Sequence, residues 1–125
     1  MDRELKITKK IIREYVRTKL ASDKVWALRA LEVVYNNQTD YEQINETTNE
    51  HNEVGFTGAD GEILTSIANQ YMRWRTLSPK QMEIVMKKMK KYWKQILPLM
   101  DTHKLYECMV RDGFLTKEQV FINLL

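Results

Sequence analysis

Apolar residues recur at helical spacing along most of the chain, and this pattern predicts an all-α fold. The clearest case is the stretch 78–97, SPKQMEIVMKKMKKYWKQIL, where Ser78, Pro79 and Gln81 have the arrangement of an N-cap, a first helical residue and a capping box. On a helical wheel its apolar side chains occupy about 140° of arc, and most of its lysines lie on the opposite side. The stretch is therefore expected to be one long helix with a core face and a basic face.

Two further helices are predicted ahead of this stretch. The segment 7–20 is amphipathic and basic on its exposed side, and Ser22 or Asp23 then caps a second helix that continues to about Asn36. The second helix is apolar around nearly its whole circumference, and such a helix is usually central. We expect it to form the buried middle of the core.

The helical pattern weakens over residues 37–53. Thr39 followed by Glu42 has the spacing of another capping box, which predicts a short acidic helix with Tyr41 and Ile44 facing inward. The remaining polar residues of this segment give no clear periodicity, so its second half is left without an assignment.

A Gly-rich turn is expected at 54–61. Its glycines, at Gly55, Gly58 and Gly61, suit a compact turn with positive φ angles. The turn leads into a helix that begins at about Asp60, or one residue earlier, and ends near Met72.

The boundaries predicted after the long helix come from residues with known positional preferences. They are a stop or kink at Pro98, a start at Asp101 or Thr102, an end at Arg111 with Gly113 as the stop, and a capping box of Thr116 with Gln119. Together the segments predict a compact bundle of about five to six helices, in a single helical domain that covers residues 1–125.

Charge is distributed unevenly, although the formal net charge is only +3. No basic residue occurs between Arg29 and Arg73, and that interval is acidic. Basic blocks lie on either side of it, over 3–29 and 73–94. This arrangement implies a polarised surface, or an electrostatic match between segments of the chain.

No pattern in the chain indicates enzyme chemistry, a metal site or a cofactor. Cys108 is the single cysteine and there are two histidines, which is too few for a closed zinc site or an internal disulfide. The Gly-rich turn lacks the following Gly-Lys-Ser/Thr of a phosphate loop, and an EF-hand alignment puts Phe56 and Ile67 at ligand positions. The helically spaced methionines are interpreted as core packing rather than as an adaptable binding groove.

The start of the chain has no apolar run typical of a signal peptide, and no stretch is long enough to span a bilayer. With a single cysteine, a reducing compartment is the simpler expectation. We therefore predict a cytoplasmic protein without membrane contact.

The basic block around the long helix is the candidate binding site. Lysines on an exposed helix face bind phosphates, and an exposed tryptophan between two arginines adds a stacking contact. The candidate nucleic-acid-binding residues are Arg73, Trp74, Arg75, Lys80, Lys87, Lys88, Lys91 and Lys94. The alternatives are a solvated lysine face, or docking of these lysines near the acidic middle segment.

Residues 52–96 also carry a recognisable pattern, in which Asn-x-x-Gly-Phe-x-x-x-Asp is followed by Leu-Ser-Pro-Lys-Gln and Lys-x-x-Lys-Tyr-x-x-Gln-Ile. The residues that carry the pattern are Asn52, Gly55, Phe56, Asp60, Leu77, Ser78, Pro79, Lys80, Gln81, Lys88, Lys91, Tyr92, Gln95 and Ile96. This part of the chain resembles a small module of uncharacterised phage proteins that is also appended to some Swi/Snf-type and other helicase-like proteins. The resemblance implies a context of phage or mobile-element DNA metabolism, and the cytoplasm of a host cell. It implies no ATPase activity, because the helicase motor is absent.

Three hypotheses follow. The first is a non-enzymatic phage or mobile-element accessory protein that binds nucleic acid through the basic helix face, mainly by backbone contacts with weak sequence preference. The second is an interaction module or inhibitor of a host protein, in defence or transcription, that uses the acidic 40–62 segment. The third is self-association through the apolar tail FINLL, and the oligomeric state is left open.

Overall fold

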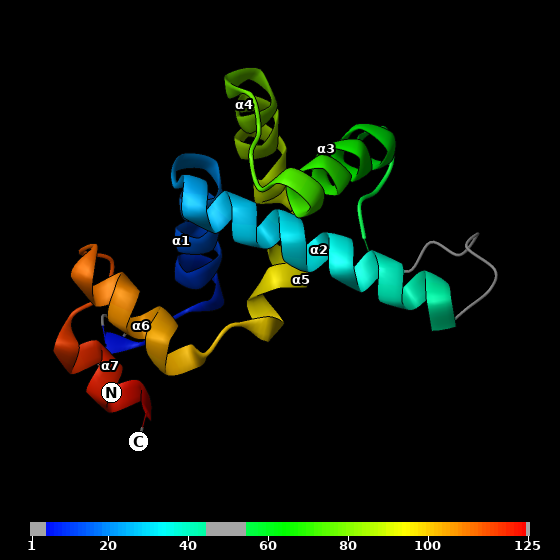
Figure 1. Cartoon of the computed structure of the whole chain (residues 1–125). Helices are drawn as coiled ribbons and strands as arrows, with labels where there is room; N and C mark the ends of the chain where they lie inside the picture. The colour runs from blue at the N-terminus through cyan, green and yellow to red at the C-terminus, as the bar shows by residue number, and fades with distance from the viewer. Residues whose placement is uncertain (1–4, 45–54, 125) are drawn as a thin grey trace.

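A computed structural model describes residues 5–44 and 55–124 of the chain, and the side chains of 41–44 are not described. Within these residues the structure is helical and has no strand, which confirms the all-α prediction (Figure 1). The elements are α1 (Lys9–Ser22), α2 (Lys24–Ile44), α3 (Asp60–Trp74), α4 (Pro79–Lys88), the 3₁₀ helix η2 (Met89–Tyr92), α5 (Trp93–Ile96), the 3₁₀ helix η3 (Leu97–Leu99), α6 (Thr102–Arg111) and α7 (Lys117–Leu124). No described helix is both long and apolar enough to cross a bilayer.

Helix α2 lies at the centre of the packing, as its apolar circumference predicts. It contacts α1, α3, α4, η2 and α5, and Figure 1 shows it running through the middle of the molecule. Ala27, Leu31 and Val34 are fully buried along it. Val25, at its N-terminal end, is by contrast 62% exposed, so one side of the helix is not covered.

The predicted end of this helix at Asn36 is wrong, and so is the separate acidic helix. Helix α2 continues to Ile44 because Thr39 does not act as an N-cap: its hydroxyl donates to the carbonyl oxygen of Tyr35, one turn earlier, at 2.6 Å. This bond is compatible with a helix interior. The inward side chains expected at residues 41 and 44 lie outside the described side chains.

Most predicted helix boundaries are confirmed, because they depend on contacts within a few residues. Asp23 accepts hydrogen bonds from the first turn of α2, Asp101 caps α6, and Gly113 has φ +83° at the end of α6. Two of the three predicted capping boxes form. The backbone N–H of Gln81 donates to the Ser78 hydroxyl at 3.1 Å, and Thr116 and Gln119 repeat that geometry.

The long helix predicted over 78–97 is interrupted. Helix α4 ends at Lys88 and the chain tightens into η2 before α5 and η3, the last of which contains Pro98. A 3₁₀ turn aligns side chains three residues apart on one side, whereas an α-helix separates them by about 60°. Met89 and Tyr92 stand three residues apart and are both buried, so the tighter turn directs both side chains into the core.

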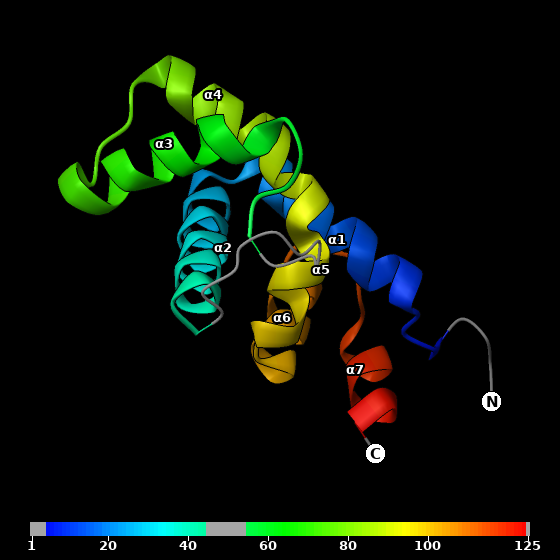
Figure 2. The same ribbon diagram turned by 90° about the vertical axis from the view of Figure 1, so that its right-hand side faces the viewer.

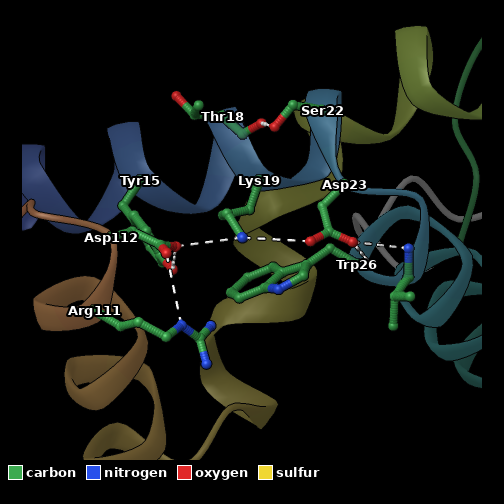
Figure 3. A network of polar contacts seen from close by, with 9 residues as sticks. Tyr15, Thr18, Lys19, Ser22, Asp23, Trp26, Arg111 and Asp112 are labelled. Carbon is green, nitrogen blue, oxygen red and sulfur yellow. Dashed lines mark hydrogen bonds and ion pairs between the residues drawn. The ribbon is translucent and has the colours of Figure 1, made fainter.

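Polar contacts tie the end of α6 to α1 (Figure 3), and others tie α7 to the residues just ahead of α1. The Tyr15 hydroxyl donates to the Asp112 carboxylate at 2.7 Å, and Lys19 bridges Asp112 at 3.3 Å and Asp23 at 3.4 Å. Burial and the hydrogen bond to Asp112 raise the pKa of Tyr15 well above its usual range. At the other end, the Asn123 amide binds the backbone of Leu5 and Ile7. These contacts fix α6 and α7 against the start of the chain.

Candidate nucleic-acid interface

Two of the predicted binding lysines pair with a buried carboxylate. Lys88 donates to Asp60 Oδ1 at 2.9 Å, and Lys91 forms an ion pair with Asp60 Oδ2. The side chain of Asp60 is only 4% exposed, and the Tyr92 hydroxyl adds a hydrogen bond to it at 3.3 Å. We call these four residues the Asp60 cluster. Lys88 and Lys91 therefore hold the start of α3 against α4 and η2.

The Asp60 carboxyl is ionised in this environment. Burial raises its pKa, but the hydrogen bonds and charges of Lys91 and Lys88 outweigh burial, and the resulting pKa lies below the ordinary value. The same contact raises the pKa of Lys91, mainly through the hydrogen bond with Asp60. Position 60 is also the first residue of α3, where the helix dipole favours a negative charge.

The Gly-rich turn is held to the same segment by its backbone. Gln95 binds both the N–H and the carbonyl of Gly55, at 3.0 and 2.9 Å, and the Thr57 N–H donates to the Tyr92 hydroxyl at 3.1 Å. Phe56 packs edge-on against the Tyr92 ring, and its N–H donates to Gln38 at 2.9 Å. Much of the sequence pattern over 52–96 is therefore one set of contacts that joins the turn to η2 and α5.

Positive φ angles occur at two of the three glycines of this turn. Gly55 has φ +89° and Gly58 has φ +58°, as expected, while Gly61 lies in the first turn of α3 without a positive φ. A Cβ at Gly55 would stand 2.5–2.8 Å from the Gln38 side chain. Gly55 is thus required both for its backbone conformation and for the close approach of α2.

The arginines at the end of α3 differ in their availability. Arg75 pairs with Glu32 of α2 at 3.3 Å and lies over the Tyr71 ring, 5.3 Å from its centroid. Arg73 is exposed and has no acidic partner among the described residues. Trp74 is 67% exposed, so its ring is open to solvent beside Arg73.

A row of lysines remains exposed along the outer side of α4, η2 and α5. We call it the outer lysine row, and it consists of Lys80, Lys87, Lys90 and Lys94. None of the four has an acidic partner within the described residues, and Lys94 rests near the Trp93 ring at 5.8 Å. Lys90 was not among the predicted site residues. The 3₁₀ turn includes Lys90, and its exposed side chain continues the row set by Lys80 and Lys87.

Helix α1 adds a second row of cations. Its exposed basic residues are Lys9, Lys10, Arg13 and Arg17, and they too lack an acidic partner in the parts of the chain that the structure describes. Helix α1 packs directly against α4, η2 and α5, and Figure 2 shows it beside this segment. Two rows of unpaired cations therefore lie on helices that are in contact.

The described acidic side chains of the middle segment differ in their exposure. Asp60 is buried in its cluster, and Glu32, just ahead of the segment, pairs with Arg75. Asp40 and Glu62 are exposed, and residues 45–54 lie outside the described part of the chain. Docking of basic side chains onto acidic ones thus occurs at Asp60.

No protein-family model, curated protein or solved structure matches the chain. Among the residues that the structure describes, no group of three or more His, Cys, Asp or Glu side chains is placed to hold a metal ion. The candidate site therefore rests on its own geometry, namely two rows of exposed cations on packed helices.

Proposed function

We propose that the protein binds the phosphate backbone of nucleic acid on a two-helix basic surface, made of the outer lysine row and the exposed cations of α1. The observation that carries the proposal is that these side chains are exposed and lack acidic partners among the described residues. Cations that are not neutralised internally attract phosphates and release counterions on binding.

The two rows belong to one surface because of how α1 is oriented. Its Tyr15 and Lys19 side chains face Asp112, Phe114 and Trp26, on the side of α6 and α2. The other flank of α1, which carries Arg13 and Arg17, is consequently the one next to α4, η2 and α5. The 3₁₀ helix η2, which carries the exposed Lys90, packs against α1.

The proposed site differs from the residues selected by sequence alone. Lys88 and Lys91 serve the Asp60 cluster, and Arg75 serves its pair with Glu32, so these three act mainly in folding. Lys80, Lys87 and Lys94 remain, joined by Lys90 and the α1 row. Arg73 and Trp74 lie at one end of α3, where a base can stack on the exposed indole.

Binding is expected to be non-enzymatic and weakly selective for sequence, since a row of lysines contacts phosphates rather than base edges. The resemblance of 52–96 to a module of phage and helicase-like proteins supports a role in the DNA metabolism of a phage or mobile element, inside a host cell. The motif residues of that module contribute mainly to folding contacts, so the resemblance supports the context and the exposed cations support the binding.

The test is equilibrium binding to labelled single-stranded and duplex oligonucleotides across a series of salt concentrations. Contact with four or five phosphates predicts a log–log salt slope of about −4 for duplex DNA, and each lost contact reduces the slope by about one. Replacing Lys87, Lys90 and Lys94 by Glu is expected to abolish binding at moderate salt. The matched control replaces Lys24, Lys104 and Lys117, exposed lysines outside both rows, by Glu, so that the net charge changes by the same amount.

Two results would overturn the proposal. One is absence of binding to every oligonucleotide at low salt. The other is an equal loss of affinity in the control, which would mean that net charge alone governs binding. Thermal unfolding of each variant establishes that a loss of binding is not a loss of fold.

A further inference from the structure

An open apolar groove lies between α2 and the segment formed by η3 and α6, with a volume of about 480 Å³. One wall is the exposed side of α2, where Val25 and Leu99 across the groove are 62% and 61% exposed. The other apolar lining residues are Trp26, Ala30, Val33, Ile96, Met100, Leu105 and Cys108. Apolar side chains on two helices thus form a surface that no described part of the chain covers.

The groove has a firm wall. Trp26 packs edge-on against Tyr15, with ring centroids 5.8 Å apart, and Lys19 lies 5.7 Å from the Trp26 ring centre (Figure 3). The hydrogen bond from Tyr15 to Asp112 fixes the end of α6 against α1, the helix that also positions Trp26. Both walls are therefore positioned by contacts outside the groove, so a ligand would meet a largely preformed site.

The charges at the rim favour an acidic occupant. Arg29 stands on the α2 wall and Lys104 on the α6 wall, and both are exposed without an acidic partner among the described residues. The only carboxylate in the lining, Asp101, is already occupied as the N-cap of α6, accepting from the Lys104 N–H at 3.1 Å. Asp101 keeps its negative charge beside Lys104 on the α6 wall, so the rim carries two cations against one carboxylate and is net positive above an apolar floor.

We infer that this groove binds one amphipathic helix of a partner protein, with apolar residues at i, i+3 or i+4, and i+7 and acidic residues on both flanks. A groove between two helices accepts a third helix in this way, through anchors at those spacings. The ten residues of α6 extend about 15 Å, which matches roughly three turns of a bound helix. This partner site is independent of the nucleic-acid surface.

Cys108 provides a local readout, because it is the only cysteine and it lines the groove. The probe is a helical peptide with leucines at the stated spacing and glutamates on both flanks, compared with the same peptide carrying lysines instead. We expect the acidic peptide to slow the reaction of Cys108 with a thiol reagent. It should bind about tenfold more tightly than the basic peptide, because the two rim cations attract glutamates and repel lysines.

Charge reversal at the rim tests whether Arg29 and Lys104 cause the preference for the acidic peptide. The double variant Arg29→Glu, Lys104→Glu is expected to favour the basic peptide. Position 104 lies in the first turn of α6, where a negative charge is compatible with the helix dipole, so the fold should persist. The double variant Lys6→Glu, Lys117→Glu changes the net charge equally at exposed positions outside the groove, so it is the matched control and should leave peptide binding unchanged.

Three outcomes would refute the inference. They are a failure of both peptides to protect Cys108, equal protection by both, or protection that rises with protein concentration in the absence of peptide. The last outcome would identify a second copy of the chain as the occupant. None of these measurements involves nucleic acid, so a negative result here would not affect the proposed nucleic-acid binding, which is tested separately.

Discussion

The Asp60 cluster allows the strongest prediction about stability. Replacing Asp60 by Asn keeps the size of the side chain and removes its charge, which leaves an amide facing the Lys88 and Lys91 ammonium groups. Hydrogen bonds to charged groups contribute about 1.5–3 kcal/mol each, and removing one member of a buried ion pair costs about 3–5 kcal/mol.

The exposure of the lysines reduces this cost. The side chains of Lys88 and Lys91 are 36% and 51% exposed, so water can solvate their ammonium groups once the carboxylate is gone. We therefore expect Asp60→Asn to lower the free energy of unfolding by about 2–3 kcal/mol, from the lower part of these ranges. For a chain of this size the melting temperature should fall by roughly 6–12 °C.

Urea unfolding at neutral pH, followed by far-UV circular dichroism, measures this change. The matched control replaces Lys87 and Lys90 by Gln, because both are exposed neighbours in the same segment, and its effect should stay within about 0.5 kcal/mol. Replacing Lys88 and Lys91 by Gln should destabilise the protein, and the triple variant with Asp60→Asn should cost less than the sum of its parts.

The reasoning is refuted if Asp60→Asn is as stable as the Lys87 and Lys90 control, or if the effects of the cluster residues simply add. Either result would mean that the carboxylate and the two lysines do not act as a unit. Lys88 and Lys91 would then be available for phosphate, as the sequence alone had suggested.

Three further predictions concern the turn and its partners. Gly55→Ala should lower the free energy of unfolding by about 2–4 kcal/mol, because the alanine would be strained by the left-handed backbone and its Cβ would overlap the Gln38 side chain. Gly58→Ala should cost only about 1 kcal/mol, because nothing lies within 4 Å of its Cβ position. Equal values for the two variants in urea unfolding would contradict the close approach at Gly55. Gln95→Leu should lower the free energy of unfolding by about 1–2 kcal/mol, because it leaves the N–H and carbonyl of Gly55 without their partner. Unchanged stability would mean that water replaces these two hydrogen bonds without a loss of free energy. The pKa of Asp60 is lowered in the folded protein, because the effects of Lys91 and Lys88 outweigh that of burial. The ionised carboxyl therefore stabilises the fold fully above its unfolded pKa of about 3.9, and this stabilisation is lost as the pH falls through the folded pKa. The wild-type protein should therefore lose stability more steeply than Asp60→Asn below about pH 4, and parallel acid profiles would refute this.

Helix boundaries were predictable from sequence where a cap and its partner are close in the chain. Ser78 with Gln81, Thr116 with Gln119, and the stop at Gly113 each depend on atoms within a few residues, so the surrounding fold hardly affects them. The apolar stripes likewise indicated which helix faces turn inward. The predicted N-cap at Thr39 is wrong because a threonine hydroxyl can either cap a helix or donate to the carbonyl one turn earlier. Hydrophobic periodicity does not distinguish these two hydrogen bonds.

The roles of the lysines were decided only by tertiary structure. Lys87 and Lys88 are neighbours with the same side chain, yet one is exposed on the outer row and the other binds Asp60, 28 residues away in the sequence. The 3₁₀ turn at η2 arises from the burial of Met89 and Tyr92 together, which depends on what α1 and the Gly-rich turn place beside them. The sequence thus determined the helices and their polar faces, because these follow from local bonds and periodicity. Packing decided which charges neutralise each other and which stay exposed.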